Sequence, residues 1–134
     1  MIIGFVSGVF DLLHTGHIIL LQQASNECDY LIVALQTDPT IERESKSKPI
    51  QSVYERFTQL KSIKYVNEVI PYTTEAELTT ILETSDINVR IVSSEYVDTY
   101  TAKHLVEAGK MKVVFLNRIG NYSSSELKQR IKND

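Results

Sequence analysis

The sequence predicts an α/β fold, in which one parallel five-stranded sheet is covered by helices on both faces. Short apolar runs alternate with segments of helical spacing from one end of the chain to the other, which is the pattern of consecutive β-α-β units. The 134 residues suffice for one domain with a core of its own. No repeat, low-complexity tract or linker divides the chain, so residues 1–134 are expected to form a single domain.

Five apolar runs are expected to be the strands. A strand that is buried on both faces of a parallel sheet reads as a continuous apolar run. The third run is expected to end before Pro71, because proline has no N–H group for the strand ladder. The five predicted strands are Ile2–Val6, Tyr30–Leu35, Glu68–Ile70, Val89–Val92 and Val113–Leu116.

Capping residues between the predicted strands mark where helices are expected to begin. A helix is expected to begin at Thr15, and another is expected to run through about Thr99–Ala108, with Gly109 ending it. Three Ser/Thr-x-x-Glu capping boxes precede apolar residues at helical spacing. The boxes pair Ser52 with Glu55, Thr74 with Glu77, and Ser123 with Glu126.

Ligands of an open parallel sheet bind beyond the carboxyl ends of the strands. That rule places the functional site in four segments: Ser7–His17, Gln36–Gln51, Ser93–Asp98 and Asn117–Ser125. The longest irregular segment, about Thr37–Gln51, belongs to this set, and a loop of that length is commonly functional or mobile. We therefore expect it to act as a mobile lid.

The first of these segments carries two histidines three residues apart, at a helix start. His14 and His17 share one face of the helix, where free N–H groups and the positive end of the helix dipole also point. Gly16 lets an anion approach the backbone closely. The arrangement predicts a phosphate site with two imidazole donors. A structural role for both histidines is the alternative, whereas zinc lacks a third ligand, since His104 lies far away in the chain.

Charge and composition exclude several classes of protein. The net charge is −3, which gives no general basic footprint for duplex nucleic acid. Residues 43–64 nevertheless hold six Lys or Arg, which suggests a small anionic ligand, although a solvated face explains such a cluster more simply. The single cysteine, Cys28, excludes a disulfide framework and fits a reducing cytosol. No apolar stretch approaches the ~20 residues of a membrane span, so a cytoplasmic protein without nucleic-acid or membrane partners is expected.

Residues Gly8–His17 resemble the HxGH signature of the nucleotidyltransferase superfamily, in the form that its cytidylyltransferases use. The likeness continues through residues 29–38, Tyr65–Pro71 and Arg118–Lys128, where the last segment is similar to the second signature of the family. The length and motifs are most similar to the small bacterial glycerol-3-phosphate cytidylyltransferases. The resemblance implies a Rossmann-like fold and a homodimer. It also implies transfer of CMP from CTP, bound with Mg²⁺, to a phosphorylated alcohol such as glycerol 3-phosphate, with CDP-glycerol and pyrophosphate as products.

The same resemblance implies a role for each matching residue. The catalytic group consists of His14, His17, Lys46 and Arg118, with Lys46 and Lys48 on the lid. Arg56 and Lys64 are implied to bind the acceptor, and no side chain is implied to hold a metal by itself. Asp11 either braces the turn or contacts the ligand. Nucleotide binding is implied for Gly8, Val9, Phe10, Asp11, Gly16, Lys48, Glu95, Tyr96, Ser123, Ser124 and Ser125.

Departures from the family pattern leave alternatives open. Ser93–Tyr96 replaces the Gly-Asp-Asp-Trp segment that contacts the base, although Tyr96 can stack on a base and Glu95 can accept from an exocyclic amine. Asn121 replaces a glycine and is expected to take a left-handed backbone conformation. An adenylyltransferase of the same fold and a nucleotide-binding protein without turnover are the two alternatives. Replacing His14 or His17 by alanine is expected to reduce turnover while leaving the melting temperature nearly unchanged.

Overall fold

The computed structural model describes residues 1–120 and 122–133, so the expectation for Asn121 lies outside the described residues. All strands pair in parallel, in the order β3-β2-β1-β4-β5. The strand order reverses at the centre of the sheet, between β1 and β4, which is where such sheets bind ligands. The predicted five-stranded Rossmann-like sheet is confirmed. The strands are β1 (Ile3–Gly8), β2 (Tyr30–Gln36), β3 (Glu68–Tyr72), β4 (Val89–Ser93) and β5 (Lys112–Leu116).

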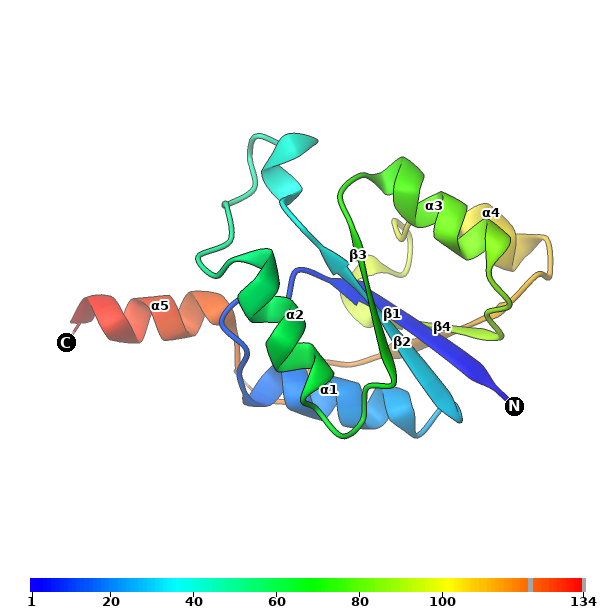
Figure 1. The fold of residues 1–134 in the computed structure, drawn as a ribbon, viewed down its shortest axis with the longest axis horizontal. Coiled ribbons are helices and arrows are strands. Elements are labelled where there is room, and N and C mark those ends of the chain that lie inside the picture. The colour runs from blue at the N-terminus through cyan, green and yellow to red at the C-terminus, as the bar shows by residue number, and fades with distance from the viewer. Residues whose placement is uncertain (121, 134) are drawn as a thin grey trace.

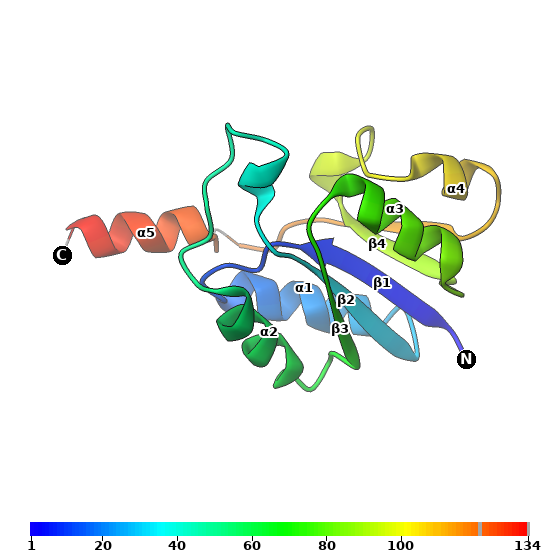
Figure 2. The same cartoon turned by 45° about the horizontal axis from the view of Figure 1, so that its top comes forward.

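Helices cover both faces of this sheet, as predicted. Figures 1 and 2 show α1 and α2 on one face and α3 and α4 on the other, while α5 extends away from the body and buries no residue. None of the helices in the described part of the chain has the length and apolarity needed to cross a membrane. The helices are α1 (Thr15–Ser25), α2 (Val53–Lys61), α3 (Glu75–Thr84), α4 (Lys103–Glu107) and α5 (Ser124–Asn133), with short 3₁₀ turns at η1 (Pro39–Ile41) and η2 (Ser94–Tyr96).

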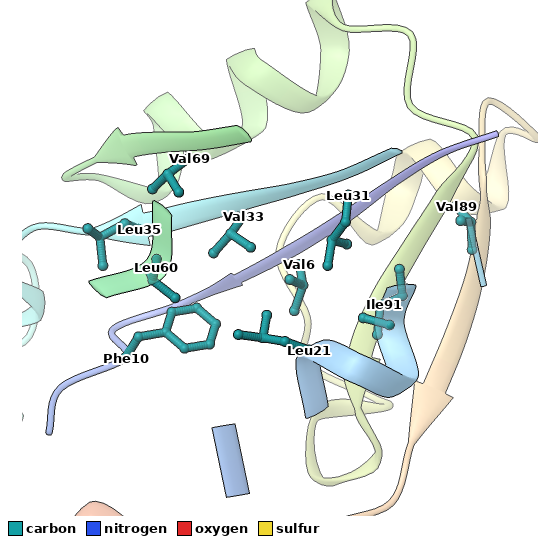
Figure 3. Close-up of a cluster of buried hydrophobic side chains, with 11 residues drawn as sticks. Val6, Phe10, Leu21, Leu31, Val33, Leu35, Leu60, Val69, Val89 and Ile91 are labelled. Atoms are coloured by element: carbon teal, nitrogen blue, oxygen red, sulfur yellow. The ribbon is translucent and has the colours of Figure 1, made fainter. Parts of the chain in front are cut away.

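Each face of the sheet has its own apolar core. Alternate residues of a strand point to opposite faces, so the continuous run in β2 supplies both cores. Val33 and Leu35 pack with Leu21 of α1 and Leu60 of α2 in the first core, which Figure 3 shows. The second core contains Phe5, Ile32, Leu78, Leu82 and Leu105.

The predicted helix starts are largely correct, but two of the three predicted capping boxes lack their reciprocal contact. The box of Ser52 and Glu55 has both bonds between backbone and side chain. Thr74 caps α3, whereas the Glu77 carboxylate accepts from the N–H of Thr73 instead of Thr74. The Ser123 hydroxyl accepts from the N–H of Glu126, whose own carboxylate pairs with Arg130.

Three predicted boundaries are wrong by two or more residues. Strand β1 continues to Gly8 instead of ending at Val6. Strand β3 continues through Pro71 to Tyr72, because β3 lies at the edge of the sheet, where a proline nitrogen can face solvent. The last helix before β5 begins at Lys103 rather than near Thr99, after Ala102 takes a left-handed conformation with φ of 60°. Gly109, with φ of 80°, follows the end of that helix as expected.

Candidate functional site

Two adjoining cavities open at the carboxyl ends of the strands. The lid-side cavity, of about 490 Å³, is bounded by the β1–α1 junction, by Glu42, Arg43 and Lys46–Pro49 of the long loop, and by Arg90 and Tyr100. The serine-side cavity, of about 370 Å³, is bounded by His14, by Glu95, by Arg118 and Ile119, and by Tyr122–Ser125. The two cavities share lining residues, which makes them parts of one cleft. The shared residues include Gly8, Val9, Phe10, His17, Tyr96 and Ser124.

The β1–α1 junction has an unusual backbone. Phe10 and Leu12 have φ values of 52° and 50°, in the left-handed region that favours glycine. Each such residue costs about 1–3 kcal/mol and persists only where its surroundings hold it. Phe10 is held by the core, where its ring packs beside Leu21 and Leu60 (Figure 3). The N–H of Leu12 donates to Oε1 of Gln51 at 2.9 Å.

The two histidines form a capping box at the start of α1. Nδ1 of His14 accepts from the N–H of Gly16 at 3.0 Å, and Nδ1 of His17 accepts from the N–H of His14 at 3.2 Å. The two rings are stacked, with centroids 3.9 Å apart. Because Nδ1 accepts in both rings, the proton of each neutral ring is assigned to Nε2. The histidines are therefore structural caps whose remaining ring nitrogen is a donor.

The surroundings of both rings favour the uncharged form. Burial, and then the neighbouring His14, lower the pKa of His17 from 6.5 to about 4. Burial, and then the charge of Arg118, lower the pKa of His14. The site thus presents neutral N–H donors, and an anion bound beside them would favour their charged forms.

His14 is also the reason for the glycine in this motif. A Cβ atom on Gly16 would lie 2.8 Å from Cε1 of His14 and 2.9 Å from Cβ of Tyr122. Gly16 therefore packs closely against the imidazole ring and Tyr122, and the approach of an anion to its backbone stays a prediction. The cap role changes one expectation, since His14→Ala removes the N-cap of α1 and must reduce stability as well.

Ser124 joins the two signature segments. Its hydroxyl donates to the carbonyl oxygen of Asp11 at 2.6 Å, across 113 positions of sequence. This bond sets the N-terminus of α5, with Ser123 and Ser125, against the β1–α1 junction. Arg118 lines the same cavity and pairs with Glu95 at 3.2 Å; both side chains are more than half exposed.

Asp11 braces the lid rather than pointing freely into the cleft. Its side chain is buried, and its two carboxylate oxygens accept from the N–H groups of Ile50 and Gln51, both at 2.9 Å. Of the two roles considered for Asp11, the structure shows the bracing contacts. Lys46 and Lys48, on the exposed stretch before this anchor, line the lid-side cavity as the prediction requires.

Arg56 does not occupy an acceptor-binding position, which corrects the prediction. The side chain is 1% exposed and lines neither cavity. Its guanidinium donates to four backbone carbonyls, from the residue after β1, from the end of β2 and from the two ends of the long loop, which leaves it a structural role. The acceptors are Val9 O at 3.0 Å, Gln36 O at 2.7 Å, Thr37 O at 2.6 Å and Gln51 O at 3.1 Å.

Lys64 does not lie at the cleft either, which corrects its predicted role in binding the acceptor. It lies in the turn between α2 and β3, at the end of the sheet opposite the long loop (Figure 1). The N–H of Asn67 in that turn donates to Leu31 O, near the start of β2, so the turn lies at the amino ends of the strands. Lys64 cannot reach a ligand at the carboxyl ends, and neither cavity includes it.

Arg90 is a charged cavity residue to which the sequence analysis assigned no role. It lies on β4, is 3% exposed and lines the lid-side cavity. A charged residue within the apolar run Val89–Val92 is the signal that could have found it. Within residues 1–120 and 122–133, no three His, Cys, Asp or Glu side chains come together as a metal site would require.

The fold is an open parallel sheet with a cleft at the carboxyl ends of its strands, and comparison with known proteins gives the family. A family model described as cytidylyltransferase-like matches residues 5–130. The chain belongs to the cytidylyltransferase-like family of the nucleotidyltransferase superfamily.

Individual relatives carry different names. The bifunctional protein HldE of Paramagnetospirillum magneticum is 32% identical over 125 residues, covering 92% of this chain and 25% of that protein. The FAD synthase of Thermococcus kodakarensis is 31% identical over 132 residues, covering 94% of this chain and 89% of that protein. The chain thus spans a quarter of HldE but most of the FAD synthase. A lipopolysaccharide core biosynthesis protein from Thermoplasma volcanium superposes with a TM-score of 0.66 at 26% identity, covering 92% of this chain and 99% of that one.

Proposed function

We propose that this protein transfers a nucleotidyl group from a nucleoside triphosphate to a phosphorylated acceptor and releases pyrophosphate. The observation that carries this proposal is the contact between the two signature segments. The hydrogen bond from Ser124 to Asp11 brings the N-termini of α1 and α5 to one cleft. Two helix N-termini, two imidazole donors, Arg118 and three serines then face the same space, a combination suited to a triphosphate.

The proposed reaction fits neutral donors better than a general base. An oxygen of the acceptor phosphate attacks the α-phosphorus. The bond between the α-phosphorus and the oxygen that bridges it to the β-phosphorus then breaks. The leaving pyrophosphate carries away the electron pair, and the attacking oxygen is already anionic, so no proton has to be removed. What remains is in-line positioning and stabilisation of the developing charge. His14 and His17 suit that role because each neutral ring keeps its proton on Nε2.

Each part of the nucleotide has matching residues in the proposal. The imidazoles hold the α-phosphate region, while Lys46 and Lys48 close over the phosphates from the lid. Arg118 and the hydroxyls at the start of α5 bind the β- and γ-phosphates, with Mg²⁺ brought in on the triphosphate oxygens. The junction residues from Gly8 to Asp11, together with Tyr96, surround the nucleoside. Arg118 exchanges its partner Glu95 for phosphate, which frees Glu95 to accept from the amine of the base.

Two nucleotide and acceptor pairs follow from different observations. The resemblance in the motifs favours CTP with glycerol 3-phosphate, giving CDP-glycerol. The Thermococcus relative of nearly equal length favours ATP, because a FAD synthase forms a product that contains an adenylyl group. Its acceptor counterpart is flavin mononucleotide, which is also a phosphorylated alcohol.

Pyrophosphate release from a matrix of substrates tests the proposal. CTP, ATP and UTP are each combined with glycerol 3-phosphate and with flavin mononucleotide in the presence of Mg²⁺. Turnover with CTP and glycerol 3-phosphate supports the first pair, and turnover with ATP and flavin mononucleotide supports the second. Nucleotide binding by calorimetry without turnover for any pair contradicts the transfer activity and favours a nucleotide-binding protein. Equal activity with UTP and CTP argues against Glu95 as the group that reads the base, since uracil lacks the amine.

The resemblance also leads us to propose a homodimer. Light scattering combined with gel filtration is expected to give a mass near twice 15.2 kDa. A mass of one chain contradicts this part of the proposal.

A further inference from the structure

We propose that Arg90 binds the phosphate of the acceptor, in the part of the lid-side cavity between β4 and the segment that contains Thr101. This inference rests on the proposed nucleotidyl transfer, because it assigns the acceptor end of the same cleft. It fills the role that Arg56 and Lys64 were predicted to have and that their positions exclude.

The position of Arg90 places a permanent cation beneath the cavity. Arg90 pairs in register with Phe5 of β1, and Phe5 belongs to the core under α3 and α4. The Arg90 side chain, 3% exposed, lines the lid-side cavity together with Tyr72 and Tyr100. His17 and the β1–α1 junction line the same cavity, so an acceptor held by Arg90 lies in the space next to the reacting phosphate.

A comparison with Arg56 shows what Arg90 lacks. Both residues are buried, but the guanidinium of Arg56 donates to four carbonyl oxygens. Arg90 donates through Nη1 to the carbonyl of Thr101, and within the described residues its buried Nε has no partner at all. A buried cation with unused donors is unfavourable unless something else completes its hydrogen bonds. The cavity beside it is where that group can enter.

Nearby carboxylates do not neutralise Arg90 by direct pairing. Burial lowers the pKa of Arg90, whereas Tyr100, Tyr72 and then the carboxylate of Glu75 raise it. That carboxylate accepts from the Thr101 hydroxyl. Glu42 accepts from the N–H of Glu75 at 2.7 Å. The ring of Tyr100 lies with its centroid 5.3 Å from the guanidinium carbon, which holds the planar group from one side. No ion pair of Arg90 is present in the described structure.

An anion with two acceptor oxygens matches the donors of Arg90 that remain. Nε and Nη2 form the side of a guanidinium that binds two oxygens of one phosphate or carboxylate. The proposed reaction brings such an anion to this cleft, namely the acceptor phosphate. Binding there completes the hydrogen bonds of Arg90 and fixes the attacking oxygen.

Steady-state kinetics on Arg90→Met and Arg90→Lys test the assignment, with Lys64→Met as the control that removes a cation far from the cleft. For Arg90→Met we expect KM for the acceptor to rise by about 10- to 100-fold, the effect of losing a charged hydrogen bond, while KM for the nucleotide stays the same. Arg90→Lys keeps the positive charge but cannot bind two oxygens of one phosphate, so its KM for the acceptor should lie between those of the wild type and Arg90→Met. The melting temperature of Arg90→Met should be unchanged or higher, because an incompletely paired buried cation is removed. Lys64→Met should match the wild type throughout.

The results that overturn the assignment are distinct from failure of the transfer activity. An unchanged acceptor KM in Arg90→Met overturns it, as does a lower melting temperature with both KM values raised, which indicates a structural role. If the wild type shows no turnover, the transfer proposal fails and calorimetry with inorganic phosphate decides on Arg90. A phosphate site that is lost in Arg90→Met but kept in Lys64→Met then supports anion binding by Arg90. Equal phosphate binding by all three proteins overturns it.

Discussion

His14 combines a structural and a chemical role in one side chain. Its Nδ1 caps α1, and Nε2 is left to act as a donor toward the cleft. Asparagine is a good N-cap without an imidazole, so His14→Asn should keep the melting temperature close to that of the wild type. Turnover should fall by ~10²–10³, as for the loss of one charge-stabilising donor. His14→Ala should show the same loss of turnover and, in addition, lose about 1 kcal/mol of stability. Wild-type turnover in His14→Asn would contradict the chemical role.

His17 makes the stability of the protein depend on pH. Its folded pKa of about 4 lies below the unfolded value of 6.5, so the unfolded chain binds more protons between these values. The free energy of unfolding should therefore fall as the pH decreases from about 6.5 to about 4, by up to roughly 3 kcal/mol from this residue. Denaturant unfolding at several pH values measures this contribution. His17→Gln keeps an acceptor for the N–H of His14 and should have a smaller slope; an identical slope in both proteins would count against it.

At the scale of elements, the long loop between β2 and α2 is anchored at its ends and free between them. Arg56 holds Thr37 and Gln51, and Asp11 holds Ile50 and Gln51. Between Glu42 and Ile50, the described contacts within the loop are few, and residues 43–48 are exposed. This arrangement suits a lid that moves while its ends stay in place.

Limited proteolysis tests the lid. Trypsin should cleave the free protein between Arg43 and Lys48, and a bound nucleotide should protect these sites because Lys46 and Lys48 then contact phosphate. Lys61 and Lys64, outside the cleft, serve as internal reference sites whose cleavage should not respond to nucleotide. Equal cleavage of the loop with and without nucleotide is the outcome that rejects closure.

The strands and helices were predictable from the sequence where a local pattern of residues determines them. The continuous apolar runs identified all five strands because both faces of the sheet are buried. The end of β3 was not predictable from Pro71, because the effect of a proline depends on whether its strand lies at an edge. The reciprocal half of a capping box likewise depends on competing partners, such as Arg130 for Glu126.

For the whole molecule, the place of the site was predictable, but the partners of individual charges were not. Motif positions at the carboxyl ends of the strands identified the histidine and serine segments, and the fold brings them into contact. Arg56 and Lys64 both looked suited to an anion by charge and position in sequence. The donors of Arg56 are bound to backbone carbonyls, and Lys64 lies at the amino ends of the strands, opposite the cleft. Tertiary partners decide such cases, which is also why Arg90 emerged only from the structure.

The central claim is nucleotidyl transfer in the cleft shared by the two signature segments, and ³¹P NMR of the reaction tests it most directly. With the pair of substrates that releases pyrophosphate, the account predicts one pyrophosphate for each new diphosphate diester that joins the nucleotide to the acceptor. His14→Asn should slow both signals together. Release of orthophosphate without a diester, or an unchanged triphosphate spectrum in the presence of bound nucleotide, would contradict the claim.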